Sequence, residues 1–246
     1  MKYKDVEVSI VTAVYNSADF IEDTIKSVLN QTHTNWEWYI IDDCSTDETS
    51  KVISQYLDDK RINYVLLDEN SGAAKARNVG LKHSRNNIVA FIDADDTWRE
   101  KKLEKQLEFM LDNNYGFTFT SYQIMGKTNG VLIPESVNYN QYMKNTIIGM
   151  LTVMINRKLV GDFSIVDIRK DHDSMTWAKL LREGHIAYGL NEVLADYRKV
   201  EGSISNNKLE AVKNHWKNCR NIEGLSVFKT SYYFIFYIAN ALKKHL

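Results

Sequence analysis

Three carboxylates lie within four residues in the run Asp93-Ala94-Asp95-Asp96, directly after an apolar segment. Carboxylates this close repel one another and cost stability unless a cation or a basic group neutralises them. Hard oxygen ligands of this kind suit Mg²⁺ or Mn²⁺ that bridges to a diphosphate. The alternative is that Asp95 or Asp96 simply caps the helix that follows. Taken alone, the run favours neither interpretation.

Two further groups of polar residues could contact a nucleotide. Asp42-Asp43 also follows an apolar segment, and a carboxylate there could accept the N3–H of uracil or hydroxyls of a ribose. Residues 70–72 form a predicted glycine turn before a helix that carries Arg77, and helix N-termini and arginine forks both suit phosphate oxygens. For the acids alone, helix capping is the favoured interpretation. For the second group, an exposed helix with incidental cations is an equal alternative.

A third acidic group, Asp171-His172-Asp173, precedes a helical pattern that contains Trp177. A carboxylate in a cleft could take the proton from an acceptor hydroxyl as a general base. A solvated loop is the alternative, and the local sequence does not separate the two.

An alternating α/β chain would position these residues. Apolar runs predict strands at 8–14, 36–41, 62–67, 88–92 and 117–120, with amphipathic helices between them, among them 73–82 and 100–111. We expect Ser17 to cap the first helix and residues 45–48 to form a capping box for the second. Strict alternation implies a parallel sheet covered on both faces, in which ligands gather at the carboxyl ends of the strands. Farther along the chain, the pattern predicts strands at 147–155 and 193–198 and a helix at 174–182.

Composition limits the classes of function. The 246 residues are 44% hydrophobic and 26% charged, as in one large α/β domain or a domain with a short appendage. A net charge of -1 argues against broad binding to nucleic acid. The two cysteines, Cys44 and Cys219, favour a reducing compartment. Neither a secretory signal nor an apolar run of about 20 residues is present, so we expect a cytoplasmic protein.

Several segments of the chain share one combined pattern. They are Val8-Ser9-Ile10-Val11 with Tyr15-Asn16, and the segments 27–32, 40–47, 72–80 and 91–98, followed by 194–198 and 202–205. In this combination the chain resembles the family 2 glycosyltransferases, over essentially its whole length, and most closely the short members that build exopolysaccharide, O-antigen or teichuronic-acid-type chains. The resemblance implies the α/β fold of the GT-A type, with a single Rossmann-like, mostly parallel sheet flanked by helices and a helical C-terminal tail.

The resemblance also implies roles for particular residues. Tyr15 and Asp43 would hold the nucleotide base, and Asp93 and Asp95 would bind a divalent metal, Mn²⁺ or Mg²⁺. The other substrate-binding candidates are Ala13, Asn16, Asp42, Gly72, Arg77, Asn78, Asp93, Ala94 and Asp96. Ala13 stands where many members have proline.

The family's catalytic base sits in a Glu-Asp or Gln-Asp pair four residues before a tryptophan. Counting back from Trp177 gives Asp173 as the base, with His172 in the position of Glu or Gln. Because that histidine departs from the family pattern, Asp171 stays an alternative base.

The implied activity is an inverting transfer of a sugar from a nucleotide-sugar donor, with a UDP-sugar expected, to a glycan or a polyprenyl-linked acceptor in cell-surface polysaccharide biosynthesis. Residues 1–205 would form the catalytic domain, with a donor half at about 1–98 and an acceptor half at 99–205, and residues 206–246 a helical tail. In the tail, residues 232–239 are apolar and aromatic and precede Lys243-Lys244-His245. This suits an interfacial helix at the inner face of the cell membrane. Packing on the domain itself or on a second subunit fits equally well.

Rival classes of function have weaker signals. A sugar-1-phosphate nucleotidyltransferase would carry a glycine-rich basic loop after the first strand, but Tyr15-Asn16-Ser17-Ala18 contains no glycine. A dinucleotide-dependent oxidoreductase would need a G-x-G-x-x-G motif there. A catalytically inactive protein that binds a nucleotide-sugar stays open.

Overall fold

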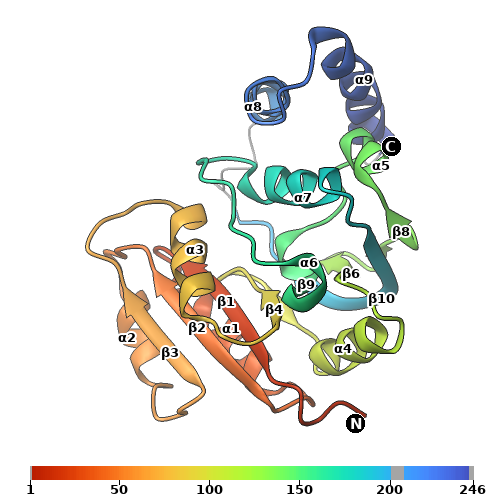
Figure 1. Cartoon of the computed structure of the whole chain (residues 1–246). Coiled ribbons are helices and arrows are strands. Elements are labelled where there is room, and N and C mark those ends of the chain that lie inside the picture. The colour runs from red at the N-terminus through yellow and green to blue at the C-terminus, as the bar shows by residue number, and fades with distance from the viewer. Residues whose placement is uncertain (1, 201–207, 244–246) are drawn as a thin grey trace.

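The chain folds around one sheet with helices on both of its faces, as the computed structural model shows for residues 2–200 and 208–243 (Figure 1). In chain order the elements are β1 (Val8–Val14), α1 (Ile21–Leu29), β2 (Trp36–Asp42), α2 (Thr49–Ser54), β3 (Ile62–Leu66), α3 (Ala73–His83), β4 (Ile88–Phe91), β5 (Thr97–Trp98), α4 (Lys102–Asp112), β6 (Phe117–Ile124), β7 (Gly130–Val131), β8 (Ser136–Val137), α5 (Tyr139–Lys144), the 3₁₀ helix η1 (Met150–Thr152), β9 (Val153–Asn156), α6 (Arg157–Val160), α7 (His172–Arg182), β10 (Ala187–Tyr197), α8 (Lys208–Asn221) and α9 (Val227–Lys243).

The strands pair in the order β3-β2-β1-β4-β9-β6-β10-β5, with β7 beside β6 and β8 beside β10. The first four run parallel to one another, and β10 is parallel to β6. β9 is antiparallel to both β4 and β6, so it reverses direction in the middle of the sheet. The predicted α/β fold with a mostly parallel sheet is therefore confirmed.

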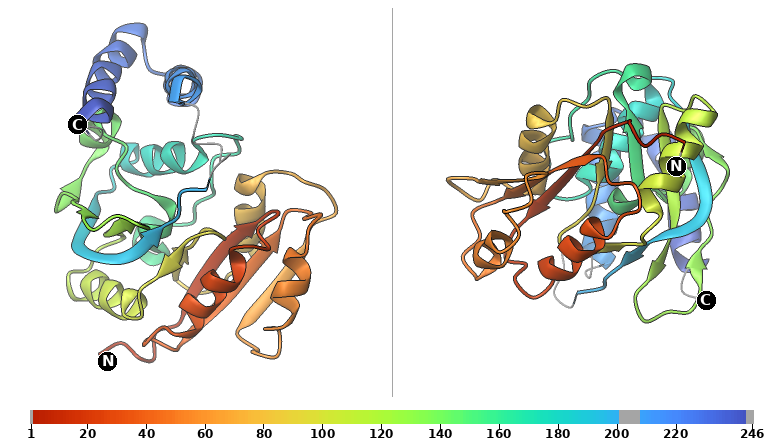
Figure 2. Two further views of the ribbon diagram at one scale, coloured as in Figure 1. Left: turned by 180° about the vertical axis from the view of Figure 1, so that it is seen from behind. Right: turned by 90° about the horizontal axis from the view of Figure 1, so that it is seen from below.

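The sheet separates two hydrophobic layers, because successive residues of a strand face opposite sides. Ile10 of β1 packs in the layer that contains α1, α2 and α4. Its neighbour Val11 packs in the layer that contains α3, α5, α7, α8 and α9. The helices on both faces of the sheet are visible in the two views of Figure 2. α3 lies so close to β1 that a Cβ atom at Gly80 would come within 2.6 Å of Val11 Cγ1.

Two predicted helix starts are wrong. α1 begins at Ile21, and Ser17 does not cap it with its side chain; the Ser17 carbonyl instead accepts the Ile21 N–H at 2.9 Å. α2 begins at Thr49 without the capping box predicted for 45–48. The Asp47 carboxylate accepts the Thr49 N–H at 3.0 Å, so local side-chain bonds shape a turn where a helix start was expected.

The predicted strand at 147–155 is wrong over its first half. Met150, Leu151 and Thr152 are buried, but they form η1, and only β9 is extended. A short apolar run does not distinguish a strand from other buried backbone. The strand predicted at 193–198 is the second half of β10, which begins at Ala187. A register shift after Leu190 interrupts the alternating pattern between the two halves.

The C-terminal helices pack on the body of the protein, next to α5 and α7 (Figure 1). Tyr233 Oη donates to Asn140 Oδ1 at 2.6 Å, and Asn240 Nδ2 donates to the Lys144 carbonyl at 3.0 Å. None of the described helices combines the length and the hydropathy that crossing a bilayer requires. The predicted boundary at 205, the segment 202–205 and residues 244–245 lie outside the described residues.

Candidate active site

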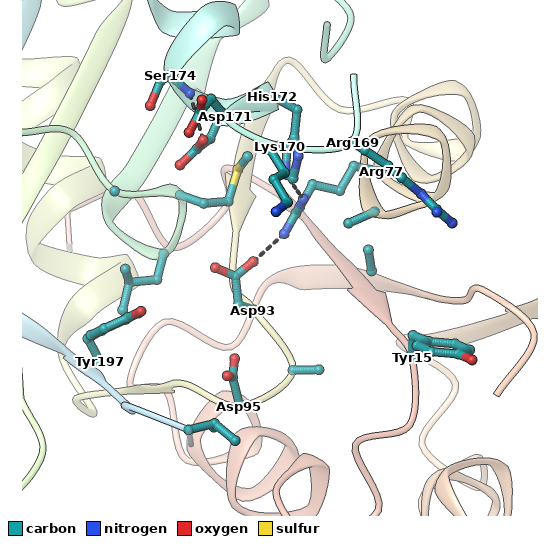
Figure 3. Close-up of a pocket in the computed structure, with 18 of the residues that line it drawn as sticks. Tyr15, Arg77, Asp93, Asp95, Arg169, Lys170, Asp171, His172, Ser174 and Tyr197 are labelled. Atoms are coloured by element: carbon teal, nitrogen blue, oxygen red, sulfur yellow. Dashed lines mark hydrogen bonds and ion pairs between the residues drawn. The ribbon is translucent and has the colours of Figure 1, made fainter. Parts of the chain in front are cut away.

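A cavity of about 930 Å³ lies between the carboxyl ends of β1 and β4 and the N-terminus of α7 (Figure 3). Eight of the residues predicted from the sequence line it: Ala13, Tyr15, Asn16, Arg77, Asp93, Ala94, Asp95 and Asp173. The alternative base Asp171 and its neighbour His172 line it too. Five other predicted residues do not line it: Asp42, Asp43, Gly72, Asn78 and Asp96.

The acidic loop after β4 is held in place by α1. Thr24 Oγ1 lies 2.9 Å from the Ala94 carbonyl oxygen and 2.8 Å from that of Asp96. Asp93 and Asp95 then direct their carboxylates into the cavity (Figure 3). Burial, followed by the negative charge of Asp93, raises the pKa of Asp95 to about 6. The carboxylates therefore repel one another as the sequence predicted, and a cation between them would relieve that repulsion.

Asp96 turns away from the cavity and holds the end of β10. It is fully buried, and its Oδ1 accepts the Arg198 N–H at 2.8 Å. Its Oδ2 has no hydrogen-bond partner among the described residues. Burial and the charges of Asp93 and Asp95 raise the pKa of Asp96 well above its ordinary value. The geometry thus gives Asp96 a positioning contact with the backbone.

Arg77 reaches the cavity from α3 and joins two of its walls. Its Nη2 donates to Asp93 Oδ1, and its Nη1 lies 2.5 Å from His172 Nε2. Only 6% of the Arg77 surface is exposed. A buried guanidinium needs such partners, because an unpaired charge in the interior is costly.

The predicted nucleotide-base residues divide into two groups. Tyr15 is 46% exposed at the cavity, where a ring face is open to a ligand. Asp43 is buried, and its two carboxylate oxygens accept the N–H groups of Ser71 and Gly72, each at 2.7 Å. Asp42 is also buried, and its carboxylate accepts from the Ser45 N–H at 2.8 Å and from a tyrosine hydroxyl of β3. In this structure both acids hold loops behind the cavity.

Asn16, Gly72 and Asn78 have backbone contacts that explain their positions. Asn16 adopts φ 46°, and its Oδ1 accepts the N–H of Thr46 at 2.8 Å. Gly72 has φ 94° at the N-cap of α3, a conformation that favours glycine. Asn78 exchanges two hydrogen bonds with the backbone of Ile165, at 2.7 and 2.8 Å. It therefore fixes the loop before α7 to α3.

α7 presents the candidate base. Asp173 lies in its first turn, with Oδ1 accepting the Ser174 N–H at 2.7 Å. Asp171 precedes the helix with φ 60° and accepts from Asn218 Nδ2 at 3.1 Å. Burial and the charge of Asp173 raise the pKa of Asp171 to about 6. Trp177 anchors the helix on the sheet, since its ring packs on Phe91 and Phe117.

Sequence reasoning missed several residues of the cavity wall: Phe20, Tyr122, Gly149, Met150, Leu151, Arg169, Lys170, Tyr197, Asn214 and Tyr237. Arg169 and Lys170 had a usable signal, because two cations directly precede the acidic group 171–173. Asn214 and Tyr237 had none, because α8 and α9 reach the cavity only through tertiary packing.

The acids fit an open metal site better than a closed one. Within the described ranges, no three histidine, cysteine, aspartate or glutamate side chains are grouped so that they could hold a metal ion. Mg²⁺ is commonly bound by one or two carboxylates together with substrate phosphates and water, and Mn²⁺ also suits such oxygen ligands. Asp93 and Asp95 supply two carboxylates, and burial together with the charge of Asp93 raises the pKa of Asp95, an effect that a bound cation would offset.

Comparisons with known proteins identify relatives of this chain. The sequence model of Glycosyl transferase family 2 matches residues 9–166. TuaG of Bacillus subtilis (strain 168) is named as a candidate teichuronic acid biosynthesis glycosyltransferase. It is 49% identical over 245 residues, which cover 97% of this chain and 97% of TuaG. The UDP-Glc:alpha-D-GlcNAc-diphosphoundecaprenol beta-1,3-glucosyltransferase WfgD of Escherichia coli is 35% identical over 245 residues, which cover 98% of this chain and 96% of WfgD.

A solved structure supports the fold. TarS of S. aureus (1-349) in complex with UDP-GlcNAc superposes with a TM-score of 0.71 at 19% identity, over 93% of this chain and 70% of TarS. The GT-A type of fold predicted from the sequence is therefore confirmed.

Proposed function

Because this chain belongs to glycosyl transferase family 2, it is a glycosyltransferase, and we propose that its donor is a UDP-hexose and its acceptor a polyprenyl-diphosphate-linked saccharide. The name of WfgD, which specifies UDP-Glc and a diphosphoundecaprenol acceptor, supports both choices, and the name of TuaG supports a role in cell-surface polysaccharide biosynthesis. The observation that carries the proposal is that Asp93, Asp95, Arg77 and the candidate base Asp173 all line the same cavity.

The donor would lie against β1, β4 and α3. Tyr15 offers an exposed ring face to the uracil, and Asp43 would support the base site from behind, through the turn at Ser71 and Gly72 whose N–H groups its carboxylate accepts. Arg77, Arg169 and Lys170 supply positive charge for the diphosphate. A divalent cation held by Asp93 and Asp95 would supply charge stabilisation for the departing diphosphate, worth several kcal/mol.

Asp173 is the proposed general base. It would accept the proton of the acceptor hydroxyl while that oxygen attacks the anomeric carbon from the face opposite the diphosphate. The bond between the anomeric carbon and the β-phosphate oxygen breaks in the same step, and its electron pair leaves with UDP. The anomeric configuration is inverted. General-base help of this kind contributes about 10²–10⁴-fold in rate.

The acceptor would enter from the side of the C-terminal helices. Asn214 of α8 and Tyr237 of α9 line the cavity together with η1. The proposed division into a catalytic domain at 1–205 and a helical tail at 206–246 therefore places part of the acceptor wall in the tail. Polar and aromatic side chains in one wall suit a saccharide, which has hydroxyls at its edges and apolar faces.

Peripheral contact with the inner face of the cell membrane is part of the proposal, because the proposed acceptor saccharide is linked to a polyprenyl lipid. α9 exposes Tyr232, Ile235 and Phe236, and Lys144 Nζ lies 5.1 and 4.9 Å from the centres of the two aromatic rings. Ile235→Ser should lower sedimentation with anionic liposomes, and Leu132→Ser, at an exposed leucine outside α9, should not. Equal sedimentation of both variants and the parent chain would remove the membrane contact from the proposal.

A binding and transfer experiment tests the central claim. The full chain is screened with UDP-, GDP- and dTDP-sugars by thermal shift with and without Mn²⁺, since a ligand of the native state raises stability with the logarithm of its saturation. The stabilising donor is then supplied with a synthetic GlcNAc-diphospho-lipid, and the anomeric configuration of the product is read by NMR. We expect a UDP-hexose to bind and its anomeric configuration to invert. If nucleotide-sugars bind but none is transferred, a catalytically inactive binding protein replaces the proposal.

A further inference from the structure

Arg77 has a different partner on each side, and only one of them is negatively charged. Nη2 donates to the Asp93 carboxylate, while Nη1 lies 2.5 Å from His172 Nε2 (Figure 3). A guanidinium has five donors and no acceptor. The contact is therefore a hydrogen bond only if His172 Nε2 offers a lone pair, which requires a neutral imidazole with its proton on Nδ1.

We propose that His172 is a positioning residue for transfer, a neutral acceptor that holds Arg77 against Asp93 and so ties the helix of the base to the acidic loop of the donor site. The inference rests on the proposed function. The contact of Asp93 with Arg77 and the contact of Arg77 with His172 together form the Arg77 link. It joins the loop after β4, the helix α3 and the first residue of α7.

The location of His172 makes the link relevant to rate. His172 is the first residue of α7 and directly precedes Asp173. A movement of α7 relative to the donor side would therefore change the distance from the base carboxylate to the reacting centre. Misplacement by about 1 Å costs on the order of a hundredfold in rate. The burial of Arg77 favours one defined geometry, because its cation is stable there only when it is paired.

The imidazole is not placed to act as the base itself. Its Nε2 lone pair points at the Arg77 guanidinium. Its Nδ1 is buried and has no hydrogen-bond partner in the described part of the chain. An acceptor hydroxyl would have to displace Arg77 from Nε2, which would leave the guanidinium unpaired on that side. Asp173 faces the same cavity without such a contact to Arg77.

The surroundings of His172 keep it neutral. Three charged groups face the imidazole: Arg77 from α3, Asp93 from the loop after β4 and Asp173 from its own helix. Burial and the positive charge of Arg77 lower the pKa of His172, and the two carboxylates oppose them. The Arg77 link is therefore complete above the lowered pKa. It is lost as the pH falls through that value, because the imidazolium has no lone pair and repels Arg77.

Two variants at position 172 distinguish the effect of losing the hydrogen-bond acceptor from the effect of changing the shape of the side chain. His172→Gln keeps an oxygen acceptor that does not titrate, and His172→Leu removes the acceptor. At pH 8 we expect kcat of His172→Gln within about threefold of the parent and kcat of His172→Leu about a hundredfold lower, with acceptor KM little changed. His83→Gln, at an exposed histidine of α3, is the matched control. As the pH falls through the lowered pKa of His172, the activity ratio of His172→Gln to the parent should rise.

The opposite results overturn the inference. An unchanged kcat in His172→Leu, or a pH-independent ratio of His172→Gln to the parent, would remove the positioning role. A direct measurement needs no activity: ¹⁵N NMR of labelled parent protein should show His172, assigned by its absence in His172→Gln, with a proton on Nδ1 and none on Nε2. A proton on Nε2 at pH 8 would refute the link. If the parent chain transfers no sugar, the proposed function fails while the NMR result still decides the tautomer.

Discussion

Asp43 gives the sharpest test of what holds the donor side together. Its carboxylate is 3% exposed and accepts two backbone N–H bonds, from Ser71 and Gly72, at 2.7 Å each. Hydrogen bonds to a charged group contribute about 1.5–3 kcal/mol each. Asp43→Ala removes both acceptors at the start of α3, so we expect a loss of about 3–6 kcal/mol in the free energy of unfolding. For a chain of this length, this corresponds to a fall in Tm on the order of 10 °C.

The assay is thermal unfolding followed by circular dichroism at pH 7.5 without nucleotide. Asp68→Asn, at an exposed acid of the same loop region, is the control. The Tm of Asp43→Asn should lie between those of the control and Asp43→Ala, because one oxygen acceptor remains. If Asp43→Ala melts within about 2 °C of the control, the backbone bonds carry little stability. A variant that melts normally but binds UDP poorly would instead assign Asp43 to the nucleotide base alone.

Three further predictions concern the acids of the cavity. Asp173→Asn should lower transfer by about 10²–10⁴-fold while calorimetry gives an unchanged donor Kd; an active variant would move the base to Asp171. Asp95→Asn should raise the Tm of the metal-free protein at pH 7.5 but not at pH 4. The folded state raises the pKa of Asp95 to about 6, so the stability that the protonated carboxyl contributes is lost as the pH rises through 6, and an uncharged asparagine avoids that loss. A gap in Tm that is equal at both pH values contradicts that cause. Asp95→Ala should also weaken UDP-sugar binding with Mn²⁺ present, and EDTA should abolish the difference from the parent; equal affinities with Mn²⁺ would argue against a metal role.

The fold was predictable where local pattern and burial agree. The apolar runs of β1 and β4 are followed by polar residues, and the rule that ligands gather at the carboxyl ends of strands placed Tyr15, Asp93 and Asp95 at one cavity. The same rule does not reveal which way a side chain turns. Asp43 and Asp96 have the right type and position in the sequence, yet their carboxylates accept backbone N–H bonds outside the cavity lining.

Other features depend on contacts between distant parts of the chain. The antiparallel β9 directly follows η1, whose buried residues have the same local pattern as a strand. Asn214 and Tyr237 reach the cavity because α9 packs on α5 and α8 packs on α9. The contact of Arg77 with His172 spans 95 residues of sequence. No local pattern encodes such a contact, although the polar group 171–173 and the family spacing before Trp177 both drew attention to residue 172.

The charges of the site predict that the proposed donor and a divalent metal would bind as a pair. Asp93 is already paired with Arg77, and burial followed by the negative charge of Asp93 raises the pKa of Asp95, so the loop still carries negative charge. A diphosphate carries negative charge of its own, so the same carboxylates would repel it in the absence of a cation. A divalent ion reverses the sign of this interaction, and a diphosphate in turn supplies the oxygen ligands that two carboxylates leave open. Each therefore raises the affinity of the other by the same factor, because coupling between two binding equilibria is reciprocal.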